Sequence, residues 1–255
     1  MQKGDYMLTP ERQRKILELL QLKDVVKIQE LTEETGASES TIRRDLSQLE
    51  EENKLKRVHG GAAKLHQKGE EPTLLEKSSK NLEMKQLISK KAAEFVNDGD
   101  CIFLDAGSTT YHIIPHLTQK NITVVTNGYD HIQLLMDKGI PTYIVGGFMK
   151  NKTGAIIGSK ASQSLQLYNF DKAFIGANGV HLKAGYTTPD PEEAHLKNLA
   201  IKLAQQSFIV ADDSKINEVT FAKIINLEEA TLITNNLDEE VQLAFAEKTT
   251  LVVAT

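Results

Sequence analysis

Apolar side chains recur at helical spacing through the first fifty residues of the chain. Thr9, as N-cap, and Pro10, at the first helical position, mark the start of the first apolar segment. Gly36 closes the second segment, and Ser38 is placed to cap the third. The pattern predicts three helices, over residues 10–22, 28–35 and 39–52.

A strand-like alternation follows directly, in the segment LKRVHGGAAKL at residues 55–65. Leu55 and Val58 alternate with basic residues before the pair Gly60 and Gly61, which is typical of a small β-hairpin. Three short helices joined by tight turns match the helix-turn-helix plan, and the hairpin adds a wing. We therefore predict a winged helix-turn-helix domain over residues 1–65.

Residues 66–81 are polar, contain Gly69 and Pro72, and lack sustained periodicity, so they are expected to form a linker. An amphipathic pattern resumes over residues 82–96 and ends at Asp98 and Gly99. It predicts the helix that opens a second domain, over residues 82–255.

Short apolar runs alternate with helical stretches through this second domain. Near-continuous apolar strands between helices indicate a mostly parallel sheet covered on both faces. The predicted fold class is α/β, with an N-terminal winged helix-turn-helix and a C-terminal mostly parallel α/β domain. The predicted strands cover residues 101–104, 122–125, 142–145, 173–175, 208–211, 231–233 and 251–253.

The charge of the chain is unevenly distributed. The formal net charge is -5, which as an average argues weakly against nucleic-acid binding. Residues 1–64, however, hold twelve basic and twelve acidic residues, and residues 53–66 include no acid at all. A local basic patch is therefore available to meet phosphates.

The third predicted helix has one apolar and one polar face. Ile42, Leu46 and Leu49 lie at i, i+4 and i+7 and are expected in the core. On the other face, guanidinium and hydroxyl groups suit a major groove. A solvated helix with surface ion pairs explains this face equally well, but the basic hairpin favours DNA. The expected DNA-binding residues are Ser38, Ser40, Thr41, Arg43, Arg44 and Ser47 on the helix and Lys56, Arg57 and His59 on the hairpin.

Polar and glycine-rich segments follow five of the predicted strands. Functional residues of a parallel sheet lie just beyond the carboxyl ends of its strands, where the loops form a crevice. We therefore expect a ligand crevice built from these segments. They are DAGSTT at residues 105–110, TNG at 126–128, GG at 146–147, GANG at 176–179 and DDSK at 212–215.

The segment DAGSTT leads into a predicted helix near Thr110, where backbone N–H groups and hydroxyls suit an anion. It lacks the patterns of the common nucleotide loops, so a phosphate on another kind of ligand is expected. Lys215 is expected as a second phosphate partner, with a merely exposed lysine as the alternative. The expected effector-binding residues are Asp105, Gly107, Ser108, Thr109, Thr110, Asn127, Gly146, Gly147, Asn178, Thr187 and Lys215.

The segment GYTTPDPEEAHLKNLAIKLA passes from a polar turn into a helix. Thr187, Thr188 and Asp190 are expected to line the crevice. Glu193 and Lys197, four residues apart, fit an ordinary ion pair on the helix surface equally well.

Neither a metal site nor a cofactor is expected. Cys101 is the single cysteine and is expected as a small buried hydrophobe. His112 and His116 share a helical face but lack a clear third ligand, which favours solvent or core packing over metal binding. With no apolar run of membrane-spanning length and no secretory pattern, we expect a cytoplasmic protein with no membrane partner.

The segment SESTIRRDLSQLEEENKLKRVHGGA resembles the recognition helix and wing of the DeoR family of bacterial regulators, and the similarity extends over essentially the whole chain. Within that family it is most similar to fructose operon repressors of Gram-positive bacteria. The resemblance implies a sensor domain similar in fold to sugar-phosphate isomerases and CoA transferases. It also implies a phosphorylated sugar as effector, with fructose 1-phosphate the first choice. The family often has a histidine in the DDSK region, where this chain has Asp213, so no effector contact is carried over to that position.

The leading hypothesis is a repressor that binds operator DNA and releases it when a phosphosugar fills the crevice. A homo-oligomer is expected, because paired helix-turn-helix units read pseudo-symmetric half-sites. The alternatives are a transcriptional activator and a sugar-phosphate isomerase. In the isomerase, Asp105 and Asp212 would handle protons and Lys215 would hold phosphate.

Overall fold

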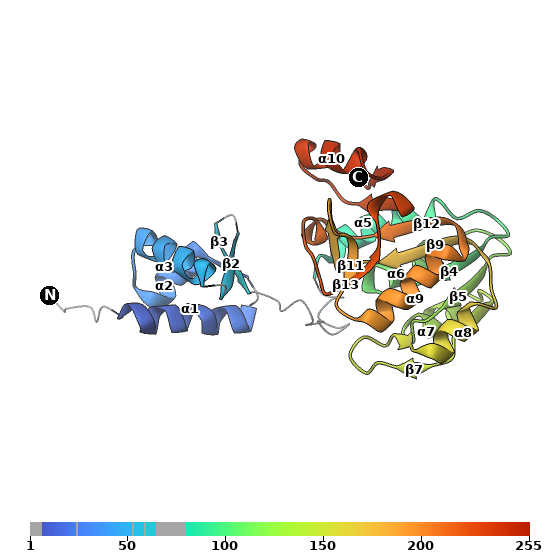
Figure 1. Ribbon diagram of the computed structural model, residues 1–255, viewed down its shortest axis with the longest axis horizontal. Helices are drawn as coiled ribbons and strands as arrows, with labels where there is room; N and C mark the ends of the chain where they lie inside the picture. The colour runs from blue at the N-terminus through green and yellow to red at the C-terminus, as the bar shows by residue number, and fades with distance from the viewer. Residues whose placement is uncertain (1–6, 24, 53, 59, 65–79) are drawn as a thin grey trace. The chain divides into compact units, whose positions relative to one another are not determined.

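The computed structural model describes residues 7–23, 25–52, 54–58, 60–64 and 80–255 (Figure 1). It divides into two units, Met1–Gln67 and Lys68–Thr255. The predicted linker lies almost entirely outside the described residues, and so does His59 of the predicted wing.

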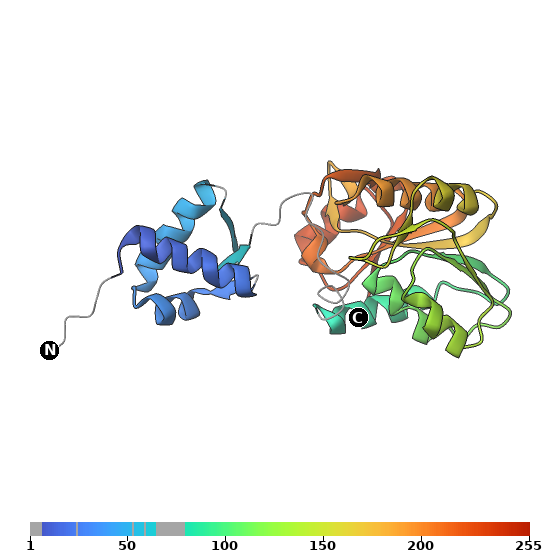
Figure 2. The ribbon, with the colours of Figure 1, turned by 90° about the horizontal axis from the view of Figure 1, so that it is seen from below.

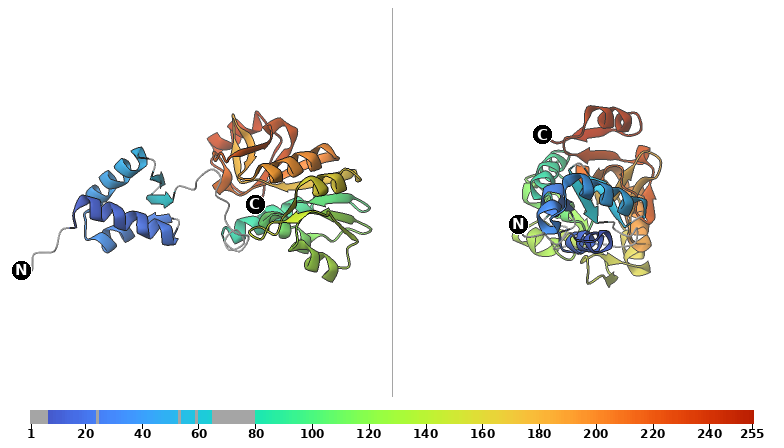
Figure 3. Two further views of the ribbon diagram at one scale, coloured as in Figure 1. Left: turned by 60° about the horizontal axis from the view of Figure 1, so that its bottom comes forward. Right: turned by 90° about the vertical axis from the view of Figure 1, so that its left-hand side faces the viewer.

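The first unit contains the three predicted helices, packed together with short strands beside them (Figure 3). The first helix begins at Thr9 itself, so Thr9 is not its N-cap as the sequence suggested. A strand before the second helix was not predicted, because three residues are too few to show alternation. The elements are α1 (Thr9–Lys23), β1 (Val25–Lys27), α2 (Ile28–Thr35), α3 (Glu39–Glu51), β2 (Leu55–Val58) and β3 (Gly61–Lys64), with β3 central in the antiparallel sheet.

Local signals set the turn and the start of α3. Gly36 adopts φ 66°, a left-handed conformation that disfavours side chains, and its N–H donates to the carbonyl of Thr32. The Ser38 hydroxyl accepts from the backbone N–H of Thr41 at 3.3 Å, confirming the predicted cap. The apolar face of α3 is fully buried, as predicted. Arg12 and Asp45 form a buried ion pair between α1 and α3 that the sequence pattern did not reveal.

Residues 80–255 contain a seven-stranded sheet in which every neighbouring pair is parallel. All seven predicted strands are present, with ends shifted by up to a few residues. They are β4 (Cys101–Leu104), β5 (Thr123–Thr126), β6 (Thr142–Ile144), β9 (Phe170–Gly176), β12 (Ala204–Val210), β14 (Thr231–Thr234) and β15 (Leu251–Val253). Their order across the sheet is β15-β14-β12-β9-β4-β5-β6.

Helices cover both faces of this sheet, as predicted for strands that read as continuous apolar runs (Figure 2). The helices are α5 (Leu82–Ala93), α6 (Ser108–Tyr111), α7 (His131–Asp137), α8 (Ser159–Leu165), α9 (Pro191–Lys202) and α10 (Glu239–Ala246), with 3-10 turns at Ile114–His116, Asp213–Lys215 and Leu227–Glu229. One hydrophobic core joins α8 and α9 to the sheet, and a second core joins α5 and α7 to its other face.

Two smaller β structures were not predicted. An antiparallel sheet has the order β10 (Gly179–His181), β11 (Gly185–Thr188), β13 (Ala222–Ile225), and a two-stranded hairpin pairs β7 (Phe148–Met149) with β8 (Ile156–Ile157). Their strands have two to four residues and few alternating positions, so the sequence pattern resembles that of loops.

Cys101 is exposed, so its prediction as a buried hydrophobe was wrong. It is the first residue of β4, and its backbone N–H donates to the Asp171 carboxylate at 2.8 Å. The apolar run therefore becomes buried only at its second residue, Ile102.

Candidate DNA interface and effector crevice

The polar face of α3 presents hydroxyl and guanidinium groups at the surface of the first unit. Ser40, Arg43 and Arg44 are exposed. The Ser38 oxygen lies 3.0 Å from the Ser40 oxygen and 2.9 Å from that of Thr41. The start of α3 thus carries a cluster of hydroxyls directly beside two arginines.

The two arginines of α3 differ in their partners. Arg43 donates from Nε to Glu39 at 3.0 Å, one helical turn away, so the surface ion pair raised as an alternative exists there. Arg44 has no ion-pair partner among the described residues. The guanidinium of Arg44 is therefore available to a ligand, whereas that of Arg43 must first release the Glu39 carboxylate.

The hairpin is joined to α3 by Arg57. Its Nη1 donates to the Ser47 hydroxyl at 2.9 Å, and its backbone N–H donates to the Glu50 carboxylate at 2.7 Å. Lys56 and Arg57 are both exposed. The predicted DNA-binding residues that the structure describes therefore lie on α3 and on the strand bonded to it, with basic groups on both elements.

In the second unit, the chain order reverses between β4 and β9, so the loops after these strands diverge. Asp105 follows β4, and Gly176 ends β9. The backbone N–H of Gly176 donates to Asp105 Oδ2 at 3.0 Å. This is where an open parallel sheet forms its crevice, as the strand-end segments predicted.

The surface-pair interpretation of Glu193 and Lys197 was wrong, because both side chains are buried and they bind different partners. Lys197 forms an ion pair with Asp105 and donates to the Gly176 carbonyl at 3.2 Å. Asp105 and Lys197 are only 2% and 5% exposed. Helical spacing alone cannot show that a whole helix face is covered by a sheet and its loops.

Glu193 binds Lys150, with 2.6 Å between their charged atoms. Lys150 also lies 2.7 Å from Asp190, the residue that caps α9. The Thr153 hydroxyl lies 3.3 Å from Glu193. This cluster attaches the segment between β7 and β8 to α9, a few residues from the ion pair of Lys197.

The DAGSTT and TNG segments are also joined to one another. Asn127 accepts from the backbone N–H of Ala106 at 2.9 Å and donates to the Ile156 carbonyl at 3.3 Å. The Thr110 hydroxyl donates to the Asp105 carbonyl and accepts from the Gly107 N–H at 3.0 Å. Because these side chains bond to neighbouring loops, they hold the crevice in shape, and a ligand would contact them in addition to these internal partners.

The remaining predicted effector residues range from buried to exposed. The Asn178 side-chain oxygen accepts from Thr188 at 3.0 Å, and the Thr187 hydroxyl accepts from the Thr220 N–H at 3.0 Å. Lys215 is partly exposed, on the turn that Asp212 caps. The other predicted residues are Ser108 and Thr109, which are buried on α6, and Gly146 and Gly147, which are exposed after β6.

His131 is a residue of this region that the sequence pattern did not single out. It opens α7, is buried, and lines a cavity of about 10 Å³ together with Gly107, Tyr111 and Gly128. Burial lowers the pKa of the imidazole to about 4, against opposing effects of Asp105 and of two backbone groups. His131 is therefore neutral at physiological pH. Its position three residues after the TNG segment is a signal that the sequence contained.

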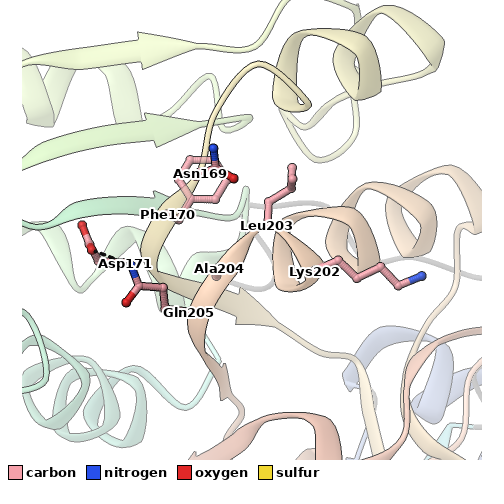
Figure 4. A pocket seen from close by; sticks show the side chains of 7 residues that line it. All are labelled: Asn169, Phe170, Asp171, Lys202, Leu203, Ala204 and Gln205. Carbon is pink, nitrogen blue, oxygen red and sulfur yellow. Dashed lines mark hydrogen bonds between the residues drawn. The ribbon is translucent and has the colours of Figure 1, made fainter.

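A larger hollow, of about 380 Å³, lies at the other end of the sheet (Figure 4). Its lining comes from the amino ends of β9 and β12, and Asp171 there accepts from Gln205 at 3.3 Å. Because the strand-end segments are all at the carboxyl ends, this hollow is separate from the candidate crevice.

Residues 80–236 match the protein family described as the DeoR C terminal sensor domain. Residues 12–68 match the family described as the DeoR-like helix-turn-helix domain. The chain belongs to the DeoR family. An uncharacterized HTH-type transcriptional regulator FruR of Bacillus subtilis is 52% identical, over 97% of this chain and 99% of its own length. A lactose phosphotransferase system repressor of Staphylococcus epidermidis is 31% identical, over 90% and 93%. A solved ribose 5-phosphate isomerase from Methanocaldococcus jannaschii overlaps 53% of this chain and 55% of its own, at 21% identity and a TM-score of 0.41.

Family membership confirms the resemblance seen in the recognition helix and wing, and with it a role in DNA-binding transcriptional regulation. The predicted fold class is confirmed as well, with an N-terminal helix-turn-helix and a C-terminal parallel α/β sheet. Among the described residues, no group of side chains is arranged to hold a metal ion, and no helix is long and apolar enough to cross a membrane.

Proposed function

We propose that this DeoR-family protein represses a sugar-utilisation operon and is released from its operator by a phosphorylated sugar, with fructose 1-phosphate as the first candidate. The observation that carries the DNA half is the polar start of α3, where Arg44, without an ion-pair partner in the described part of the chain, stands beside three clustered hydroxyls. The start of such a helix fits the major groove, and Lys56 and Arg57 of the hairpin supply phosphate contacts.

The effector half rests on the loops at the reversal of strand order. Gly107, the hydroxyls of α6 and the partly exposed Lys215 provide groups for a phosphate, and Asn178 provides one for sugar hydroxyls. The name of the staphylococcal relative, a repressor of a sugar phosphotransferase system, supports an effector of this class.

A repressor of this kind requires two states with different affinities for the effector, because a ligand that binds both states equally shifts nothing. The buried ion pairs Lys197–Asp105 and Lys150–Glu193 connect the crevice to α9 and to the β7–β8 hairpin. They offer a continuous path by which effector binding alters the assembled protein.

The isomerase alternative has less support. It needs Asp105 as a proton carrier, whereas this carboxylate is buried, paired with Lys197 and bonded to the Gly176 N–H. The two relatives from Bacillus subtilis and Staphylococcus epidermidis are both named as regulators. Incubation with hexose phosphates, followed by chromatography of the products, tests this alternative; turnover that is lost in Asp105→Asn would favour it.

The direct test is fluorescence anisotropy of the labelled upstream region of the protein's own operon, at a stated salt concentration. We expect specific binding that is reversed by fructose 1-phosphate and not by inorganic phosphate or free fructose. Lys215→Met serves as a matched variant, retaining operator affinity while weakening the response to the sugar. Specific binding that no phosphosugar reverses would contradict the effector half alone, and no specific binding at all would contradict the proposal.

A further inference from the structure

The outer edge of the parallel sheet is apolar. In the part of the chain that the structure describes, strand β6 is terminal in the sheet and pairs with β5 alone. Tyr143 and Ile144 on this strand are 54% and 44% exposed, and Phe148 and Met149 on the adjoining β7 are 70% and 42% exposed. So many exposed large apolar side chains within seven residues mark an interaction surface.

This edge also lacks the features that normally prevent strand pairing. Residues 139–149 contain no acidic, basic or histidine side chain. Natural sheets commonly protect an exposed edge strand with charge, especially lysine, or with proline inside the strand. Strand β6 itself contains no proline. Pro141 directly precedes it, and the Pro141 carbonyl accepts from the backbone N–H of Val124 in β5.

The backbone geometry of β6 suits a second strand. Pro141 and Val145 bond inward to β5, so the alternation of the ladder directs the N–H and C=O groups of Thr142 and Ile144 outward. A two-fold axis at Tyr143 places Thr142 of one copy opposite Ile144 of the other. Both positions then form hydrogen-bonded antiparallel pairs, and the two Tyr143 side chains become direct neighbours.

The charge of the surface fits the same occupant. A two-fold interface brings each residue close to its own copy, so a charged patch would repel itself, whereas the uncharged edge does not. The ring of Tyr143 packs 5.6 Å from that of Tyr168, which extends the apolar surface to Leu167 at the end of α8.

We propose that β6 and the β7 segment form the interface with a second copy of this chain, by antiparallel pairing of β6 with β6. The proposal deepens, and rests on, the repressor function proposed above, for which the sequence led us to expect a homo-oligomer. The Lys150 contacts that join the β7–β8 hairpin to α9 place this interface next to the effector crevice. An effector bound in the crevice could then change the pairing of two chains, and with it the spacing of their DNA-binding units.

Sedimentation velocity on the full chain tests this interface. We expect the wild type to be a dimer or higher oligomer, and Ile144→Lys to raise the dimer dissociation constant at least tenfold. Leu243→Lys, at a more exposed apolar position on α10, is the control and leaves the constant unchanged. A wild type that remains monomeric, or an Ile144→Lys variant that assembles as the wild type does, overturns the proposal.

A crosslink supplies a second readout that does not depend on weakening the dimer interface. In a Cys101→Ser background, Tyr143→Cys should form a disulfide dimer on mild oxidation, because residues opposite one another across the axis have adjacent Cβ atoms. Leu243→Cys should not. Absence of the Tyr143→Cys crosslink in a protein that sediments as a dimer assigns dimerisation to another surface. A wild type that is dimeric but does not bind the operator would instead contradict the proposed function and leave this interface unaffected.

Discussion

The DNA-binding face and the effector crevice are built in opposite ways. The first comes from residues 38–57, close together in the chain, and Ser40, Arg43 and Arg44 point into solvent. The second gathers residues 105–215 from several strand ends, and many of its polar side chains are buried and bonded to one another. Function at the first surface is therefore separable from folding, whereas function at the second is not.

The largest expected effect concerns the effector crevice, where function is not separable from folding. Lys197→Met leaves the buried Asp105 carboxylate without its ion pair, which should destabilise the second unit by about 3–5 kcal/mol. Urea unfolding followed by circular dichroism measures the change. Lys202→Met, on the exposed side of the same helix, is the control.

A double variant sharpens this test. Lys197→Met combined with Asp105→Leu removes both charges, and apolar replacements of a buried pair are often nearly neutral. Most of the lost stability should therefore return. If the single variant proves as stable as the wild type, the buried pair is not a structural part of the crevice.

Arg44→Ala tests the DNA-binding face, where function is separable from folding. It should weaken operator binding by about 1–3 kcal/mol, the value of a good bidentate contact to a base, without lowering the thermal midpoint. Anisotropy with the operator fragment measures the affinity. Arg14→Ala removes an arginine that is also exposed, on α1, and should bind as the wild type does. Equal losses in both variants would mean that charge alone, not position, matters.

His131 predicts a pH dependence that only the second unit should show. Its folded pKa, lowered by burial to about 4, lies below the ordinary 6.5, so the unfolded state binds the proton first as the pH falls. Its stabilising contribution is present above pH 6.5 and is lost between 6.5 and 4, by about 2 kcal/mol from pH 7 to pH 5. Thermal unfolding of wild type and His131→Gln at both pH values measures it. The variant should lose less stability on acidification than the wild type.

The same contrast explains which features the sequence predicted. Helical spacing, the Ser38 cap and the glycines defined the first unit, because these signals are local, and continuous apolar runs defined the seven parallel strands. The partners of Lys197 and Glu193 were missed since they come from distant segments. The antiparallel sheet of β10, β11 and β13 was missed because strands of three or four residues show almost no period.

The smallest expected effect concerns Glu39, which competes with DNA for Arg43. Their ion pair is exposed and so contributes about 0.5 kcal/mol or less. Glu39→Gln frees the guanidinium and removes a negative charge from the end of α3 that faces phosphates in the proposed complex. Operator affinity should rise about twofold, with the larger gain at low salt, where charges are least screened.

Glu51→Gln is the matched control, since it removes the same charge from the far end of the same helix. It should change operator affinity less than Glu39→Gln does. The opposite result, weaker binding by Glu39→Gln, is informative about mechanism. It would mean that the Glu39 carboxylate accepts a hydrogen bond from a cytosine amino group or positions Arg43 for one base, because only a directed contact outweighs the relief of repulsion. Comparing the two variants on operators altered at single positions separates these roles, since a lost base contact shows at one position and a charge effect at all of them.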